Sequence, residues 1–340
     1  MTNIAEERTM VDSNIDDMFK KMTEARDRYQ AKAMSIPGVF GTSIGIRQVA
    51  GKLVAEPAII FHVEKKRSLQ EIPVDGRIPK ELEGFPTDVV AEDPPATDGA
   101  PHTQAADVND DTKYRPLKGG CQIAEGHTYP YGTGTLGCAV KYIGSDRPSE
   151  TLYNGRIYVL SASHVMLGVG NHIFQPTNLG DRIGSVRASV LDDGVDAAIA
   201  DIGWYLDGAV PEIIDIGPVK GSYTVTAKDL TSNSGYPVKK RGRTTGVTSG
   251  TIYALGYNGT NRPGGDKKAV KDQIKIVTRD SNNNIVTGFA DAGDSGSVVI
   301  NNNGQVIGLL TSMTLAGTEG YYFTTPIRTV LNRLQIEILV

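Results

Sequence analysis

From residue 117 onward, short apolar runs alternate with Gly, Asn and Asp, and this pattern limits the folds open to the chain. The runs include TLGCAVKYI, RIYVLSA, AAIADIGWYL, DQIKIVT and QVIGLLTSM. Their regular spacing, without helical segments between them, is typical of an all-β barrel or sandwich. Residues 117–340 are therefore predicted to form one mainly β domain. It closes with TPIRTVLNRLQIEI, whose apolar spacing predicts a C-terminal helix.

Three segments precede this domain. Residues 1–35 are predicted to contain an amphipathic helix that packs on its own chain, because Ile15, Met18, Phe19 and Met22 recur at helical spacing. The β-type runs of residues 36–90 predict a small α+β accessory domain. Residues 91–116 are rich in Pro, Asp and Ala, which predicts a flexible linker. The stretch 257–272 is expected to be a surface loop.

Composition narrows the classes of partner. The net charge is −4, and the 35 Lys and Arg residues form no dense block, so neither nucleic acid nor a membrane is expected as a partner. No secretory signal stands at the start, which predicts a cytoplasmic protein with Cys121 and Cys138 reduced. The cysteines lack metal-site spacing, and no metal or cofactor is predicted. His62 lies in an apolar run and is interpreted as a structural histidine.

The run GDSGS raises the question of a catalytic serine. A serine hydroxyl needs a histidine base, a carboxylate that orients the base, and amide donors for the oxyanion. Ser295 stands between Gly293 and Gly296, which allow a tight turn. All five histidines precede Ser295, and this order excludes an α/β-hydrolase triad. Asn303-Gly304 then predicts a hairpin behind the serine.

The remaining triad members are predicted from chain order and context. His164 follows the apolar run RIYVLSA, and Asp196 is followed by small apolar residues that favour a buried carboxylate. His172 is the alternative base, in a turn-like context. The alternative carboxylates are Asp192, Asp193 and Asp201.

The segments SASH, GVDAA and GDSGS, in this order, resemble the motifs of the chymotrypsin-like (trypsin-fold) serine peptidases. KRGRTTGVTSGTI adds a resemblance to a bacterial trypsin-like group that also resembles the plant Narrow leaf 1 protein. The resemblance implies a chymotrypsin-like double six-stranded antiparallel β-barrel. It implies the triad His164, Asp196 and Ser295, with oxyanion amides from Gly293 and Ser295. It also implies a substrate pocket built from Phe289, Thr311, Met313 and Gly320, with a preference for small or apolar substrate side chains.

The function expected from this resemblance is that of a serine endopeptidase acting on a protein or peptide substrate through an acyl-enzyme. Two features leave the state of the enzyme open. The start of the β domain, RPLKGGCQI, does not resemble the free N-terminus whose amine pairs with the residue at Asp294 in activated relatives. A latent enzyme, with an activating protease or a regulatory partner at the N-terminal region, is therefore an alternative. A non-catalytic binding protein on the same scaffold is another.

Overall fold

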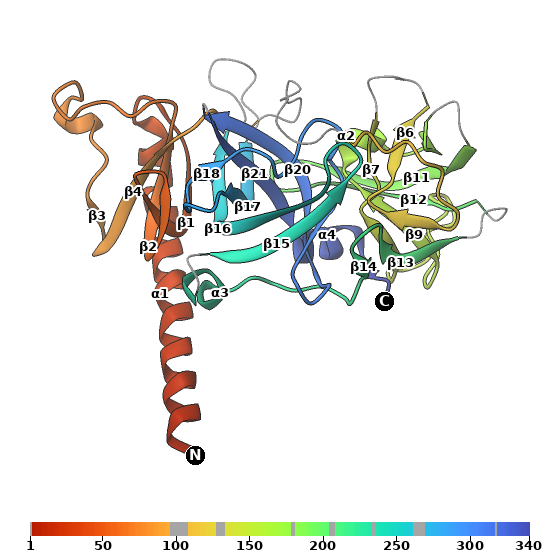
Figure 1. The fold of residues 1–340 in the computed structure, drawn as a ribbon, viewed down its shortest axis with the longest axis horizontal. Coiled ribbons are helices and arrows are strands. Elements are labelled where there is room, and N and C mark those ends of the chain that lie inside the picture. Colours follow the sequence, from red (N-terminus) through yellow and green to blue (C-terminus); the bar gives the residue numbers. More distant parts are fainter. Residues whose placement is uncertain are drawn as a thin grey trace.

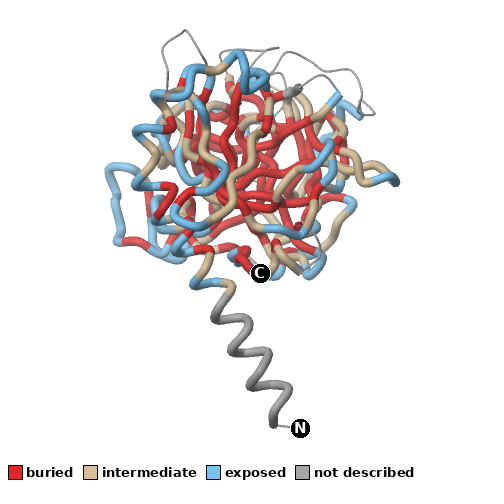
Figure 2. The backbone as a smooth tube through the Cα atoms, turned by 90° about the vertical axis from the view of Figure 1, so that its left-hand side faces the viewer, coloured by how far each residue is buried: buried red, intermediate tan, exposed pale blue. Residues whose placement is uncertain are grey.

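A computed structural model describes residues 2–95, 108–126, 133–177, 181–203, 208–232, 235–260, 269–316 and 318–340. Figure 1 shows two β-rich units side by side, with the N-terminal segments packed against one of them. In Figure 2 the buried backbone fills the interior, and the exposed segments lie at the periphery. The middle of the predicted linker, residues 96–107, lies outside the described residues.

The first β unit carries the predicted histidine and aspartate. Its eight-stranded sheet has the order β22-β8-β9-β12-β11-β10-β6-β7, and a three-stranded sheet of order β14-β13-β5 accompanies it. Its strands are β5 (Leu117–Gly119), β6 (Gln122–Glu125), β7 (Thr133–Thr135), β8 (Cys138–Tyr142), β9 (Ile157–Ser161), β10 (His172–Gln175), β11 (Asp181–Leu191), β12 (Asp196–Asp201), β13 (Ala209–Ile213), β14 (Gly217–Pro218) and β22 (Ile336–Ile338).

The second β unit is a closed antiparallel barrel. Its ladder runs β15-β16-β17-β21-β20-β19 and returns to β15. The predicted hairpin is confirmed, because β19 and β20 pair around Gly304, whose φ of 80° suits glycine. The strands of this unit are β15 (Tyr236–Gly242), β16 (Gly246–Thr260), β17 (Ala269–Arg279), β18 (Ile285–Val286), β19 (Val298–Ile300), β20 (Val306–Ala316) and β21 (Glu319–Pro326).

The mainly β, chymotrypsin-like double-barrel fold class is confirmed, with a closed barrel beside a half-barrel sheet. The stretch expected to be a surface loop differs from the prediction, because β16 extends to Thr260 and β17 begins at Ala269. Residues 261–268 between them lie outside the described part of the chain.

The N-terminal strands continue the sheet of the second unit. β1 (Val39–Val49) pairs antiparallel with β16 and with β2 (Lys52–Val63), and β2 pairs parallel with β4 (Phe85–Ala91), which pairs with β3 (Glu81–Leu82). A Cβ at Gly45 would overlap the backbone of Ala254, so glycine lets β1 approach β16. The division into domains stays a prediction. The strands of residues 36–90 continue the hydrogen-bonded sheet of the barrel through the pairing of β1 with β16.

The described helices are short apart from the first. They are α1 (Thr2–Ser35), α2 (Ser163–Met166), α3 (Ala227–Ser232) and α4 (Ile327–Leu334), with a 3-10 turn at Val74–Gly76. α1 buries Phe19, Met22 and Ala25 in a core cluster shared with β1 and β2, as expected of a helix that packs on its own chain. None of the helices within the described ranges is long and apolar enough to cross a membrane.

The C-terminal helix forms but ends earlier than its quoted segment. α4 stops at Leu334, and Gln335 adopts a left-handed conformation with φ 55°. The alternating residues that follow make β22, which pairs with β8 and buries Ile336. Cys121 and Cys138 are unbonded and buried, and burial raises the pKa of each thiol to about 12.

A buried charged cluster joins the accessory strands to the barrel. His62 on β2 contacts Glu92 at 2.8 Å and Ser43 Oγ at 2.9 Å, and Lys275 on β17 forms an ion pair with the same carboxylate. All three ionisable side chains are fully buried. The Lys275 ammonium lies 4.9 Å from the ring centroid of Phe323. The prediction that His62 is a structural histidine agrees with this setting.

Acid should weaken the fold through His62. Burial, helped by the Lys275 charge, lowers the pKa of His62 from 6.5 to about 4. Between these values the unfolded chain binds the proton and the folded chain does not, so stability falls as pH drops from 6.5 to 4. The limiting slope for one proton is about 1.4 kcal/mol per pH unit. Urea denaturation at several pH values should show a smaller slope in His62→Gln, and an unchanged slope in the exposed control His172→Gln. Equal slopes in wild type and His62→Gln would contradict the prediction.

Candidate active site

His164 and Asp196 form a hydrogen-bonded pair in the first unit. His164 lies in the single-turn helix α2, directly after β9, and Asp196 opens β12, which pairs with β9. The Asp196 carboxylate contacts His164 Nδ1 at 2.5 Å and accepts the His164 backbone N–H at 3.0 Å. The Asp196 side chain is 11% exposed and the His164 side chain is 23% exposed. The carboxylate therefore holds His164 at two points, the ring Nδ1 and the backbone N–H, and part of the ring stays open to solvent.

The alternative residues lie in other interactions. His172 Nδ1 contacts Ser185 Oγ at 3.0 Å. Asp192 accepts the N–H groups of a turn and contacts Arg333, and Asp193 contacts Lys271. Asp201 contacts Arg187. The structure thus brings Asp196, among these carboxylates, to His164.

Ser295 lies in a turn whose backbone conformation requires glycine at a position before the serine and at the position after it. Gly293 has φ 94° and Gly296 has φ 90°, a region that other residues rarely adopt. A Cβ at Gly293 would lie 2.5 Å from Thr244 Oγ1, and a Cβ at Gly296 would overlap Ser161 Oγ. Glycine is therefore required at both positions for conformation and for space.

The same turn presents two backbone amides. Within the described part of the chain, neither the Gly293 N–H nor the Ser295 N–H donates a hydrogen bond, and neither residue is buried. The neighbouring carbonyls are held, because Thr135 Oγ1 donates to the Gly293 carbonyl at 2.9 Å and the Thr135 N–H donates to the Ser295 carbonyl at 2.9 Å. A fixed loop with two available donors is the arrangement that an oxyanion hole requires.

The two units meet at this turn. A Cβ added to Gly134 would contact the side chain of Val165 and would lie 3.1 Å from the Ser295 carbonyl oxygen. Val165 follows His164 in the chain. Gly134 therefore lies between the histidine segment and the serine turn, and its lack of a side chain lets the two approach each other. Among the described residues, no hydrogen bond joins the Ser295 hydroxyl to another group. In proteins without substrate, catalytic hydrogen bonds are often long and tighten on binding.

The buried side chain of Asp294 holds the Ser295 turn in place. Its carboxylate is fully buried and forms an ion pair of 2.9 Å with Lys240, whose side chain is also fully buried. The N–H groups of Thr244 and Thr245 donate to Asp294 Oδ1 at 2.8 and 3.2 Å. Burial lowers the pKa of Lys240, while the Asp294 charge opposes that shift. An internal lysine thus supplies the cation for Asp294.

A strap of residues 108–116 holds the Arg243–Gly246 turn from the outside. The Val108 N–H donates to the Thr244 carbonyl at 2.7 Å, and the Asp110 N–H donates to the Arg243 carbonyl at 2.8 Å. The Asp110 carboxylate forms an ion pair with Arg241. Burial acts to raise the pKa of Asp110, but hydrogen bonds from Thr112, Arg241 and Tyr114 outweigh it and lower the pKa. This end of the predicted linker is therefore bound to the barrel.

The four residues predicted to form a substrate pocket lie on or beside the barrel core. Phe289 is fully buried, and its ring centroid lies 5.3 Å from that of Tyr322. Met313 belongs to the same hydrophobic cluster, and Thr311 is 5% exposed. A Cβ at Gly320 would lie 2.5 Å from the Tyr322 hydroxyl. Phe289 and Met313 are thus core residues here, and the pocket stays a prediction.

Sequence reasoning missed two contributors to the site. Lys240 falls in the KRGRTTGVTSGTI segment, which by itself predicts no role for it, although a lysine on an otherwise apolar strand face is a usable signal. Asp110 falls in the segment predicted to be a flexible linker, because that segment has few large apolar residues. Among the described residues, no cluster of His, Cys, Asp and Glu has the arrangement of a metal site.

Comparisons with known proteins give a likeness of fold. No model of a protein family matches the chain, and no curated protein matches it. Among solved structures, the chain is similar to Nocardiopsis protease, at 22% identity and a TM-score of 0.48, with 66% of this chain and 99% of that chain covered. It is similar to Thermobifida fusca protease A, at 20% identity and a TM-score of 0.47, with 66% and 98% covered.

A third similar structure is described as a glutamic acid specific serine protease that uses a histidine triad in substrate binding. It shares 18% identity and a TM-score of 0.47, with 66% of this chain and 100% of that chain covered. At these identities and TM-scores, the fold assignment rests on the strand pairing described above and not on the likeness.

Removing Lys240 should destabilise the protein. Lys240→Met leaves the Asp294 carboxylate buried without its cation, and breaking a buried pair in this way costs about 3–5 kcal/mol. Lys239→Met is the matched control, because Lys239 is the half-buried neighbour on the same strand and is in no described ion pair. Urea denaturation should give the large loss for Lys240→Met alone. A loss below about 1 kcal/mol would show that Asp294 does not depend on Lys240.

Proposed function

We propose that the chain is a serine endopeptidase that cleaves peptide bonds through an acyl-enzyme. The observation that carries the proposal is the His164–Asp196 pair, doubly hydrogen-bonded and separated from the Ser295 turn by Gly134. An imidazole held at Nδ1 by a carboxylate presents Nε2 as a base. The substrate class, a protein or peptide, is part of this proposal.

In the proposed reaction, Ser295 Oγ attacks the scissile carbonyl carbon while His164 Nε2 takes the hydroxyl proton. Asp196 keeps the Nδ1 proton in place and stabilises the imidazolium. The carbonyl oxygen becomes an oxyanion that accepts hydrogen bonds from the N–H groups of Gly293 and Ser295. His164 then donates its proton to the leaving amine, and water attacks the acyl-enzyme by the same route in reverse.

The Lys240–Asp294 pair supports an enzyme that is active without processing. In trypsin-like enzymes that are activated by cleavage, the new N-terminal amine pairs with the buried aspartate, and the oxyanion turn forms only then. Here Asp294 already has a buried ammonium at 2.9 Å and two backbone donors. We therefore infer that activation by N-terminal cleavage is not needed. A regulatory partner at the N-terminal region stays compatible with this inference.

A fluorophosphonate should label wild-type protein at Ser295. Ser295→Ala should not be labelled, whereas Ser281→Ala, a change of an exposed serine, should be labelled as wild type is. Labelling is measured by intact mass. In a separate assay of peptide turnover, Asp196→Asn should reduce the rate by roughly 10⁴-fold, because the imidazole then loses its orienting acceptor. A folded wild type that takes no label would contradict the proposal in its unprocessed form and would favour a latent enzyme or a binding protein.

Loosening the strap should slow the chemical step. Asp110→Ala removes the carboxylate that pairs with Arg241 and accepts from Tyr114, so the strap holds the turn that binds Asp294 less firmly and the proposed oxyanion amides are positioned less well. Misplacement by about 1 Å costs up to about 10²-fold in rate. We expect the second-order rate constant of fluorophosphonate labelling to fall at least about tenfold in Asp110→Ala. Asp111→Ala, an exposed neighbour, is the control. Equal rates in both variants would show that the strap does not position the site.

A further inference from the structure

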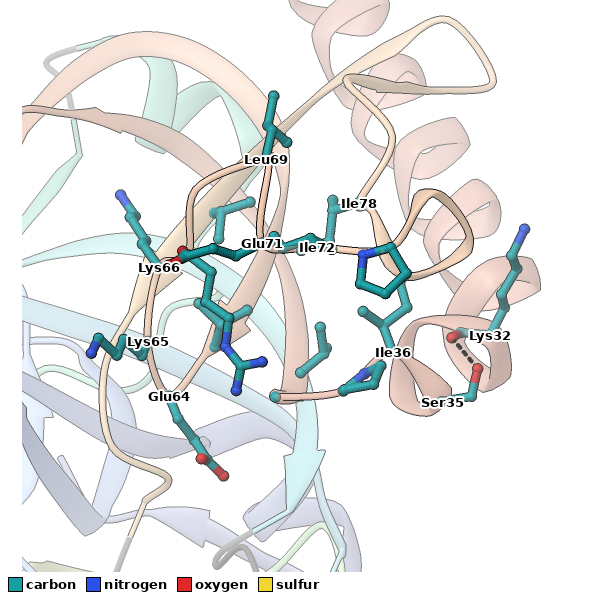
Figure 3. A pocket seen from close by; sticks show the side chains of 18 residues that line it. Lys32, Ser35, Ile36, Glu64, Lys65, Lys66, Leu69, Glu71, Ile72 and Ile78 are labelled. Atoms are coloured by element: carbon teal, nitrogen blue, oxygen red, sulfur yellow. Dashed lines mark hydrogen bonds between the residues drawn. The ribbon is translucent and has the colours of Figure 1, made fainter.

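A cavity of about 620 Å³ lies in the N-terminal part of the protein. It is bounded by the C-terminal end of α1, the paired ends of β1 and β2, and the segment 64–78 that leads from β2 towards β3. Figure 3 shows Ile36, Ile72 and Ile78 within this region, with Lys32 on the helix side and Lys65 and Lys66 on the opposite side. Its volume falls in the range of small-molecule sites, about 300–1,000 Å³.

The wall of the cavity is aliphatic. The apolar side chains that form it come from the helix end, the strands and the segment 64–78, and they include Ile36, Val39, Val63, Ile72, Ile78 and Val89. Apart from prolines, no ring or amide side chain lines the cavity within the described residues. Ile36, Val39 and Val63 are buried, so the floor is part of the core cluster. Such a wall suits an alkyl chain better than a peptide, whose backbone needs hydrogen-bond partners.

The rim of the cavity carries an excess of positive charge. Four cationic residues line it, namely Lys32, Lys65, Lys66 and Arg67, against the two carboxylates Glu64 and Glu71. The Glu71 carboxylate already accepts the N–H and the hydroxyl of Ser68. In the described part of the chain, none of the four cations forms an ion pair, and Lys32 lies 5.2 Å from the Tyr29 ring centroid. The rim therefore complements an anion.

We propose that this cavity binds a single-chain amphipathic carboxylate, with its alkyl chain against the aliphatic wall and its carboxylate at the Lys65–Arg67 side of the rim. An inorganic anion would leave the aliphatic wall uncovered, and a neutral hydrocarbon would make no use of the positive excess of the rim, where two carboxylates stand against four cations. The proposal does not depend on the proposed peptidase activity, because the cavity lies in residues 32–89 and the triad lies in residues 164–295.

The test is calorimetric titration of the full chain with dodecanoate below its micellar concentration. Wild type should bind with one-to-one stoichiometry. The double variant Lys65→Glu, Lys66→Glu should bind at least about tenfold more weakly, because its rim repels the carboxylate. Lys20→Glu, a charge reversal at an exposed position of α1, is the control and should bind as wild type does.

Two further measurements separate the parts of the proposal. Methyl dodecanoate should bind at least about tenfold more weakly than dodecanoate, and equal affinities would overturn the role of the rim. Ile78→Trp should fill the cavity and remove binding, with circular dichroism showing that the variant is folded. Absence of dodecanoate binding to wild type would overturn the whole proposal. The proposal would also be overturned if wild type bound anionic phosphatidylserine vesicles or an acidic peptide but not free dodecanoate, and if the double variant lost that binding.

Discussion

The buried ion pair between Lys240 and Asp294 is the interaction on which the site depends. Asp294 is the residue before the proposed nucleophile, so the position of its carboxylate determines the course of the turn that presents Ser295. A buried carboxylate is stable only with a cation and hydrogen-bond donors around it, and β15 and the Thr244–Thr245 backbone supply both. The positions of the Gly293 and Ser295 amides, the proposed oxyanion donors, therefore depend on an ion pair that solvent does not reach.

Much of the site could be predicted from the sequence, because its parts are local. The Gly-Asp-Ser-Gly turn needs glycine at two positions, and the order of histidine, aspartate and serine excluded a rival architecture. What could not be predicted are contacts between distant segments. Asp110 looks like a linker residue in sequence, and only the fold brings it to Arg241. The burial of Phe289 likewise depends on Tyr322, from a strand that sequence spacing does not place beside it.

The sequence predicts the fold class, but it does not predict which strands pair with each other. The strand periodicity indicated a barrel, yet nothing local in β1 shows that it pairs with β16. The buried cluster of His62, Glu92 and Lys275 adds a charged contact between the accessory strands and β17, next to this pairing. Lys240 and Lys275 play parallel parts, since each brings a charge inside the second unit, and each is neutralised by a carboxylate from another segment. Joining the wrong segments would leave an unpaired buried charge, which is far more costly than a poor apolar contact.

The pairing of β22 with β8 has a consequence for how the chain matures. β22 consists of residues 336–338, C-terminal to every strand of the second unit, and it forms the outer strand of the eight-stranded sheet of the first unit. During synthesis the histidine and aspartate segments emerge long before their sheet can be completed. Pairing across nearly two hundred residues also carries a high loop-closure cost and slows folding. The sheet of the first unit is therefore completed only after all strands of the second unit have been synthesised, so the histidine and aspartate segments depend on a strand that follows the serine segment in the chain.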